Sequence, residues 1–158
     1  MEEQEFQTLY EATARPIHAY VLGVTGQKDV ADDVLQEAYF RFFLHQPAGM
    51  PADEARRYLF RIATNLLRDR WRARRDEQWP EGFDRGFSND VNMQLDVRQA
   101  MKALNPRERE ILWLAYVEGM SHAEIGGITG LKVSSVRPML FKARQKAAGL
   151  LRPVKEIL

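Results

Sequence analysis

The segment from Arg56 to Arg75 (RRYLFRIATNLLRDRWRARR) constrains the fold most, because its apolar side chains recur at steps of three and four residues. This period is typical of an amphipathic α-helix that buries one face. The segment holds eight arginines against a single acid, Asp69, although the formal net charge of the whole chain is only +1. Arginine binds phosphate oxygens in a bidentate manner and stacks on flat rings. The exposed face therefore suits nucleic acid, and a solvated basic helix without a ligand is the alternative.

Helical periodicity continues through the chain, and no segment shows the two-residue alternation of a half-buried strand. Glycines and prolines divide the pattern and leave residues 77–93 without a helical period. We therefore expect an all-α fold of two small helical domains, residues 1–76 and 94–158, joined by a flexible acidic linker over residues 77–93. The helices are expected at about 5–22, 29–45, 52–76, 94–104, 106–118, 121–129 and 134–151.

Charge along the chain alternates between acidic and basic blocks. Residues 1–37 and 76–96 are mainly acidic, whereas residues 56–75 and 132–155 are mainly basic. Two separate cationic surfaces indicate two contacts on one polyanion. The acidity of the linker is equally consistent with mimicry of RNA and with ordinary solvation.

Several function classes are disfavoured by composition. With zero cysteines, the chain has no disulfide framework, thiolate zinc site or cysteine nucleophile. The three histidines are scattered, and neither metal-ligand spacing nor a phosphate-binding glycine loop is found. We therefore expect a protein that is not an enzyme and needs no metal or cofactor. The acidic N-terminus and the lack of an apolar run of about 20 residues predict no membrane insertion and a cytoplasmic location.

Residues 121–146 (SHAEIGGITGLKVSSVRPMLFKARQK) have the pattern of a helix-turn-helix. Gly126 is small where the two helices would approach closely, and Gly130 suits a left-handed turn residue. Such a motif uses the N-terminal residues of its second helix for base edges and its other basic residues for phosphates. An ordinary helical hairpin with a basic exterior is the alternative.

Three segments in this order resemble the RNA polymerase sigma factors of the extracytoplasmic-function (ECF) subfamily of the sigma-70 family. Residues 29–43 (DVADDVLQEAYFRFF) resemble the polymerase-binding segment, and residues 58–75 resemble the helix that melts and reads the −10 element. Residues 103–151 resemble the −35-binding domain. The resemblance implies a sigma factor that binds core RNA polymerase and promoter DNA, and it leaves open whether an anti-sigma factor also binds. The alternative function is a stand-alone helix-turn-helix regulator with an N-terminal dimerisation domain.

The resemblance also implies roles for individual residues. The polymerase-binding set would dock on the clamp helices of the core enzyme, with Leu35 and Phe42 at its margin. The residues alone favour a solvated acidic face beside a core of Val34, Tyr39 and Phe43, and it is the resemblance that favours the polymerase contact. The polymerase-binding residues are expected to be Asp32, Asp33, Leu35, Gln36 and Glu37.

Asn65 matches the asparagine that the family places near the flipped base of the −10 element, and an amide can both donate to and accept from a base edge. Arginines around it would bind the backbone phosphates. Trp71 could stack on a base or pack in the core. The −10 set is expected to be Arg61, Asn65, Arg68, Arg72, Arg74 and Arg75.

The second helix of the helix-turn-helix departs from the family at Pro138 and Met139, where a small polar residue and an arginine are common. The −35 preference therefore cannot be transferred from relatives, and Arg137 becomes the leading candidate for reading a base. Met139 could contact a thymine methyl group. The −35 set is expected to be Ser134, Ser135, Arg137, Met139, Lys142 and Arg144.

Overall fold

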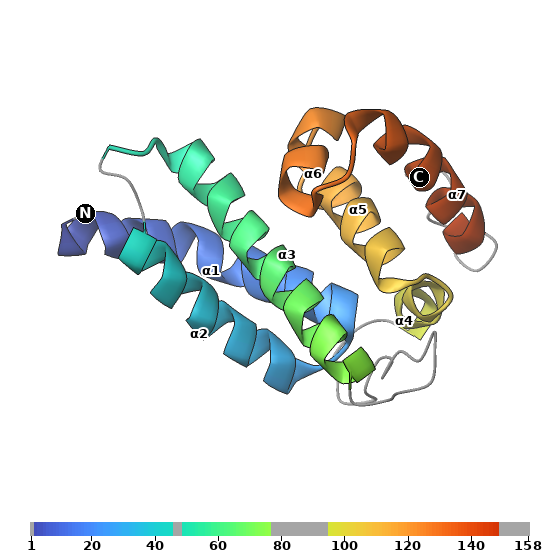
Figure 1. The fold of residues 1–158 in the computed structure, drawn as a ribbon, viewed down its shortest axis with the longest axis horizontal. Coiled ribbons are helices and arrows are strands. Elements are labelled where there is room, and N and C mark those ends of the chain that lie inside the picture. Colours follow the sequence, from blue (N-terminus) through green and yellow to red (C-terminus); the bar gives the residue numbers. More distant parts are fainter. Residues whose placement is uncertain (1, 46–48, 77–94, 149–158) are drawn as a thin grey trace.

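The computed structural model describes residues 2–45, 49–76 and 95–148, with the side chains of residues 74–76 and 95–98 left aside. These ranges contain seven helices and no strand (Figure 1). The predicted all-α fold with two helical domains is confirmed, and the predicted linker lies outside the described residues. None of the described helices is long and apolar enough to cross a membrane. The helices are α1 (Glu3–Thr25), α2 (Lys28–His45), α3 (Ala52–Asp76), α4 (Leu95–Lys102), α5 (Pro106–Tyr116), α6 (His122–Thr129) and α7 (Val133–Ala148).

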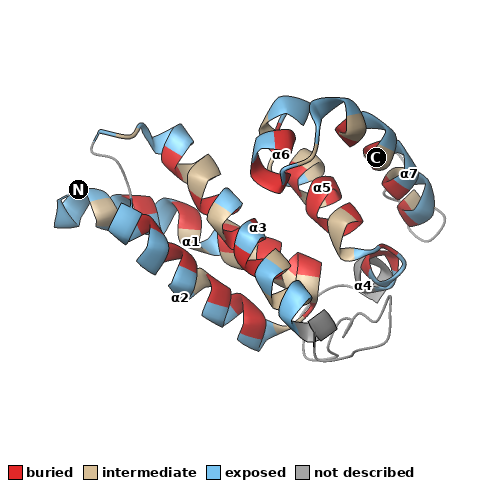
Figure 2. Ribbon diagram, in the orientation of Figure 1, coloured by how far each residue is buried: buried red, intermediate tan, exposed pale blue. Residues whose placement is uncertain are grey.

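Helices α1, α2 and α3 pack against one another and bury the apolar stripe that the sequence predicts on each (Figure 2). The inward face of α3 is anchored by a polar contact, because the Tyr20 hydroxyl of α1 lies 2.8 Å from the Thr64 hydroxyl. Both side chains are fully buried. A hydrogen bond made inside a core fixes the rotation of a helix more strictly than apolar packing does. The outward direction of Asn65, the next residue of α3, follows from this anchor.

The second domain begins its helices with side-chain caps. Asn105 accepts a hydrogen bond from the Glu108 backbone N–H of α5, and Ser121 does the same for Glu124 of α6. In both cases the glutamate carboxylate accepts a hydrogen bond from the backbone N–H of the capping residue, which completes a capping box. Helix α6 ends at Gly130, whose φ of 79° is in the left-handed region that glycine adopts without strain. The chain then turns directly into α7, as the helix-turn-helix pattern predicts.

The two domains lie against each other, with α5 beside α1 and α6 beside α3 (Figure 1). At the first contact, Gly23 leaves room for the Trp113 ring: a Cβ atom at Gly23 would lie 2.4 Å from Trp113 Cζ3. Arg109 is buried nearby and donates hydrogen bonds to the carbonyls of Met101 (2.7 Å) and Val24 (3.0 Å). Val24 is close to the C-terminal end of α1, where the helix dipole favours a cation. This contact therefore combines close packing with a buried charge.

Candidate nucleic-acid interface

The outward face of α3 carries the residues predicted to bind the −10 element. Arg61, Asn65 and Arg72 are exposed, and they follow one another at steps of four and seven residues, so they share one side of the helix. The buried residues Leu59, Ala63 and Leu66 occupy the opposite side. An exposed amide between two exposed guanidinium groups can hydrogen-bond to a base while its neighbours bind phosphates. The side chains of Arg74 and Arg75 lie outside the described residues.

Arg68 differs from its neighbours, because it is half-buried and donates a hydrogen bond to the Thr129 carbonyl at the end of α6. Burial, together with the nearby guanidinium groups of Arg107 and Arg72, lowers the pKa of Arg68. Arg107 donates to the same carbonyl at 2.9 Å. In this structure Arg68 therefore contacts the second domain.

Trp71 lies on the margin of α3 nearest the second domain. It is half-buried and lines a cavity between the domains together with Leu67 and Arg68. With 3.6 residues per helical turn, its side chain is about 120° around the helix from that of Asn65. Trp71 and Asn65 therefore face different surroundings in this structure.

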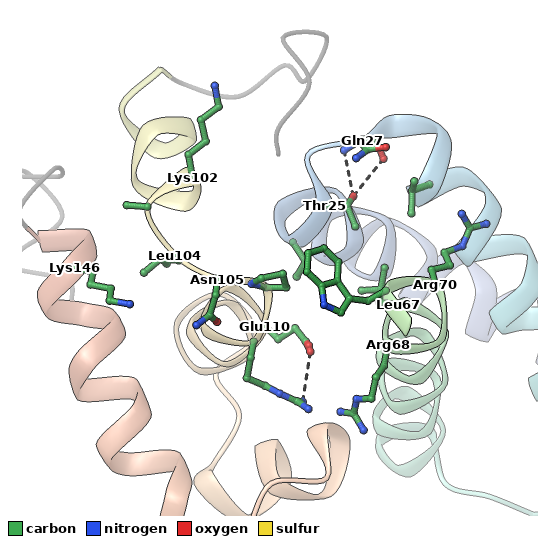
Figure 3. Close-up of a pocket in the computed structure, with 16 residues that line it drawn as sticks. Thr25, Gln27, Leu67, Arg68, Arg70, Lys102, Leu104, Asn105, Glu110 and Lys146 are labelled. Atoms are coloured by element: carbon green, nitrogen blue, oxygen red, sulfur yellow. Dashed lines mark hydrogen bonds and ion pairs between the residues drawn. The ribbon is translucent and has the colours of Figure 1, made fainter. Parts of the chain in front are cut away.

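The cavity has a volume of about 640 Å³ and contains one buried acid, Glu110 of α5. Figure 3 shows Glu110 and Arg68 on facing walls, contributed by α5 and α3. Burial raises the pKa of Glu110 to about 7, against the opposing influence of Arg107 and Arg68. Arg107 lies 3.6 Å from Glu110. The carboxyl group therefore titrates near neutral pH at the boundary between the domains.

The acidic residues of α2 form the second predicted site. The side chains of this site are exposed at Asp32, Asp33, Gln36 and Glu37. The three carboxylates are each paired with a basic side chain. His18 lies 2.8 Å from Asp32, Arg70 lies 3.5 Å from Asp33, and Arg41 lies 3.0 Å from Glu37. Ion pairs between exposed groups contribute at most about 1 kcal/mol, so a partner could replace them readily.

The burial of the apolar residues at the end of α2 differs from what the sequence predicted. Phe42 is fully buried and Phe43 is 57% exposed, so the expectations of a marginal Phe42 and a core Phe43 are wrong. The buried stripe of α2 runs through Val34, Ala38 and Phe42 at four-residue steps, which turns Phe43 outward. Leu35 is half-buried and packs against the core. Phe40 and Leu44 are exposed with Phe43, so an apolar patch continues the acidic face toward the end of the helix.

The third predicted site is the second helix of the helix-turn-helix, α7. Its buried side contains Val136, Leu140, Ala143 and Ala147. Of the six predicted DNA-binding residues, Ser134, Arg137 and Lys142 are exposed and Ser135 is half-buried.

Two predicted α7 residues are engaged within the protein. Met139 is half-buried and packs against the core, and Arg144 donates a hydrogen bond to the Tyr116 hydroxyl. The Arg144 guanidinium also lies over the Tyr116 ring, 5.9 Å from its centre. Phe141, which the sequence analysis did not single out, is 56% exposed and shares a face with Arg137 at a four-residue step. An exposed aromatic ring among basic residues is the signal that could have identified it.

Comparison with known proteins places both halves of the chain in one family. Residues 9–77 match Sigma-70 region 2, and residues 94–146 match Sigma-70 region 4. CnrH of Cupriavidus metallidurans, an RNA polymerase sigma factor, is 30% identical over 138 residues, which cover 76% of this chain and 72% of CnrH. The chain belongs to the sigma-70 family of RNA polymerase sigma factors.

Other relatives agree with the ECF subfamily that the sequence predicts. The ECF sigma factor SigE of Mycolicibacterium smegmatis is 32% identical over 139 residues, which cover 78% of this chain but only 52% of SigE. The ECF sigma factor EcfG of Rhodopseudomonas palustris is 28% identical over 149 residues, covering 89% of this chain and 81% of EcfG. The predicted membership of the ECF subfamily is thereby confirmed.

A solved structure supports the fold of this sigma factor. The sigma factor RpoE of Bartonella quintana, crystallised with the anti-sigma factor NepR, superposes with a TM-score of 0.77 at 21% sequence identity. The match covers 94% of this chain and 98% of RpoE. At this identity the likeness concerns the fold alone. The region 2 match contains α2 and α3, and the region 4 match contains the helix-turn-helix.

Proposed function

We propose that this sigma factor binds core RNA polymerase and directs it to promoters by contacting the −35 element with α7 and opening the −10 element with α3. The observation that carries this proposal is the arrangement of α3: an exposed Asn65 lies between exposed Arg61 and Arg72 on a helix whose opposite face is buried. A helix with this face can bind a strand backbone and present one amide to a base.

Opening DNA requires a base to be taken out of the stack at a cost of a few kcal/mol. Arginine–phosphate contacts along α3 and one captured base, which contributes about 1–3 kcal/mol, are sufficient to offset this cost. A stand-alone regulator would need no such face. We therefore prefer the sigma-factor function to a helix-turn-helix regulator with a dimerising N-terminal domain.

For the polymerase contact we propose the acidic face of α2 together with the apolar patch formed by Phe40, Phe43 and Leu44. Interfaces combine a desolvated apolar centre with charged residues at the rim. The exposed carboxylates would orient α2 on a basic partner, and the apolar side chains would supply most of the affinity. The proposed contact residues are Asp32, Asp33, Leu35, Gln36, Glu37, Phe40, Phe43 and Leu44.

For the −35 element we propose that Arg137 reads a base edge from the exposed face of α7, with Ser134 and Phe141 beside it. Lys142 would bind phosphate. An anti-sigma factor is a further proposed partner, because the related RpoE was crystallised with one. In this proposal the chain catalyses no reaction and binds no cofactor. It acts in the cytoplasm.

The proposal is tested by transcription in vitro. Purified chain is added to core polymerase on a library of promoter fragments, and start sites are mapped by sequencing. We expect specific start sites with both components and none with either alone. A failure to obtain specific initiation across the library would exclude the sigma-factor function. Specific DNA binding by the chain alone, as a dimer, would support the regulator instead.

A further inference from the structure

The cavity between the two domains has apolar walls that come from both of them. Its volume of about 640 Å³ is within the range of about 300–1,000 Å³ that small-molecule sites have. The indole ring of Trp71 is the largest apolar group among the lining residues. The apolar lining includes Val24, Val30, Leu67, Trp71, Leu104 and Pro106. These walls offer a flat, uncharged ring a surface on which to pack.

The same cavity has an excess of positive charge. Its basic residues are Arg68, Arg70, Lys102, Arg107 and Lys146, against Glu110 as the one acid in the lining. Three of the five form ion pairs: Arg70 with Asp33 at 3.5 Å, Lys146 with Glu108 at 3.0 Å and Arg107 with Glu110 at 3.6 Å. Among the described residues, no carboxylate forms an ion pair with Arg68 or Lys102. Two positive charges are thus left without a counter-ion, and an anion would neutralise them.

Two of these cations converge on one neutral acceptor. Arg68 of α3 and Arg107 of α5 both donate to the Thr129 carbonyl, Arg107 at 2.9 Å. A carbonyl at a helix C-terminus carries only a partial negative charge, so it cannot neutralise two guanidinium groups. The pKa of Arg68 is lowered by burial and further by the charge of Arg107. An anion with several oxygens, such as a phosphate, could accept hydrogen bonds from both arginines.

The remaining polar groups favour an anion at this end of the cavity. Figure 3 shows Glu110 facing Arg68, and Lys146 reaching toward the cavity from α7. Burial raises the pKa of Glu110 to about 7, so part of its population is uncharged at neutral pH. This carboxyl group therefore repels an anion less than an exposed glutamate would.

We propose that the cavity between the domains binds a nucleotide, whose phosphates contact Arg68 and Arg107 and whose base packs beside Trp71. An inorganic anion would leave the apolar walls unfilled, and an uncharged ring would leave the cations without a counter-ion. Because the site contains residues of both domains, the bound nucleotide stabilises their contact. This inference goes beyond promoter recognition and does not depend on it.

The site is tested by isothermal titration calorimetry on the isolated full chain in magnesium-free buffer. The probes are ADP and GDP, with adenosine and inorganic pyrophosphate as their separate fragments. We expect one nucleotide to bind per chain, at least about tenfold more tightly than either fragment, because hydrogen bonds to charged groups add to the packing of the ring. The proposal is overturned if neither nucleotide gives saturable binding. It is also overturned if pyrophosphate binds as tightly as the nucleotides, since an anion alone would then suffice.

Two substitutions separate the phosphate contact from the base contact. Arg107→Gln removes one of the converging guanidinium groups and should weaken nucleotide binding about tenfold or more. Trp71→Leu should weaken nucleotide binding but leave the affinity for pyrophosphate unchanged. The matched control for R107Q is Arg15→Gln, because Arg15 is exposed on α1 and does not line the cavity. Circular dichroism verifies that each variant is folded. If R107Q and W71L are folded and both bind the nucleotide as wild type does, the site is not this cavity.

Glu110→Gln supplies a variant that should gain affinity, which a damaged fold would not produce. At pH 8 the wild-type carboxyl group is ionised, and the groups that face it are Arg107 on its own helix, Arg68 on α3 and Tyr20 on α1. The amide removes the one negative charge of the lining, so we expect E110Q to bind the nucleotide about fivefold more tightly than wild type at pH 8. Weaker binding by folded E110Q would overturn the placement of the phosphates beside Arg68 and Arg107.

Discussion

At the scale of single residues, the buried carboxyl group of Glu110 links the stability of the fold to pH. It is 6% exposed and lies where α5 faces the first domain. The charged and titratable groups around it are Arg107 on its own helix, Arg68 on α3 and Tyr20 on α1. Desolvation outweighs the two cations, which is why the pKa is raised to about 7.

We predict that Glu110 makes the folded protein less stable as the pH rises. An unfolded glutamate ionises near pH 4.5, whereas the folded group retains its proton up to about pH 7. Between these values the unfolded state binds fewer protons, so the free energy of unfolding falls with increasing pH and levels off above pH 7. The shift corresponds to about 3 kcal/mol at most.

Thermal unfolding of Glu110→Gln between pH 4.5 and pH 8 tests this prediction. The amide resembles the protonated acid, so we expect the variant to match wild type near pH 5 and to melt several degrees higher at pH 8. The control is Glu11→Gln, an exposed residue hydrogen-bonded to Gln7, which should keep the pH dependence of wild type. A lower melting temperature for E110Q at pH 8 would contradict the assignment.

At the scale of secondary-structure elements, α7 contains a residue that opposes its own helix. Pro138 is the sixth residue of α7, beyond the first turn, and it is exposed. A proline there cannot donate to the carbonyl four residues earlier, at Ser134, and its ring strains the preceding turn. The helix is retained because Val136, Leu140 and Ala143 are buried against its neighbours.

We predict that Pro138→Ala raises the free energy of unfolding by about 1–3 kcal/mol, because it restores the backbone hydrogen bond and a good helix former. Urea denaturation followed by circular dichroism measures this change. Pro106→Ala is the control: Pro106 is at the N-terminal turn of α5, where proline is favoured, so its replacement should give no gain. A less stable P138A would indicate that the ring makes a favourable contact that outweighs the lost bond.

Some basic residues of α7 are free to bind DNA, whereas others are held by contacts within the protein. Lys142 is exposed, whereas Arg144 is hydrogen-bonded to Tyr116. We predict that Lys142→Ala lowers the slope of log affinity against log salt by about 0.9, the value for one lost phosphate contact, without changing the melting temperature. Arg144→Ala should lower the melting temperature as well. The measurement is duplex binding by anisotropy from 50 to about 200 mM salt, the range over which phosphate contacts dominate. An unchanged slope in K142A would remove Lys142 from the phosphate-binding set.

At the scale of the whole molecule, the domain architecture follows from the sequence, whereas the contact between domains does not. Each helix has its own apolar period and its own breaks, so the seven helices could be predicted within a few residues of their bounds. Phe42 is buried and Phe43 is exposed, the reverse of what the sequence predicted. Adjacent residues point about 100° apart around a helix, so only tertiary packing decides which of two neighbouring apolar side chains is buried. The interdomain contact depends on distant residues, such as Gly23 and Trp113, that no local pattern connects.

The same limit applies to the candidate sites. The exposed amide of Asn65 and the acidic face of α2 could be predicted because they lie on one helix each. The engagement of Arg68 with Thr129 and the burial of Met139 could not, since both require the position of a second helix. The sequence therefore indicates which residue types each face presents, and tertiary structure decides which of them are free to bind.

The division of work between the two domains leads to a prediction for Asn65. If α7 binds the −35 element and α3 opens the −10 element, Asn65→Ala should leave the initial binding of promoter duplex unchanged. The same substitution should reduce strand opening by about tenfold or more, because one base contact contributes about 1–3 kcal/mol. The assay uses holoenzyme on a promoter identified by start-site mapping, with permanganate reactivity for opening and anisotropy for binding. Lys142→Ala is the reciprocal control, because it should weaken binding but not the opening of DNA already bound. Equal loss of binding and opening in N65A would mean that Asn65 supports the fold of α3 and does not read a base, and circular dichroism of the variant would then show a loss of helix.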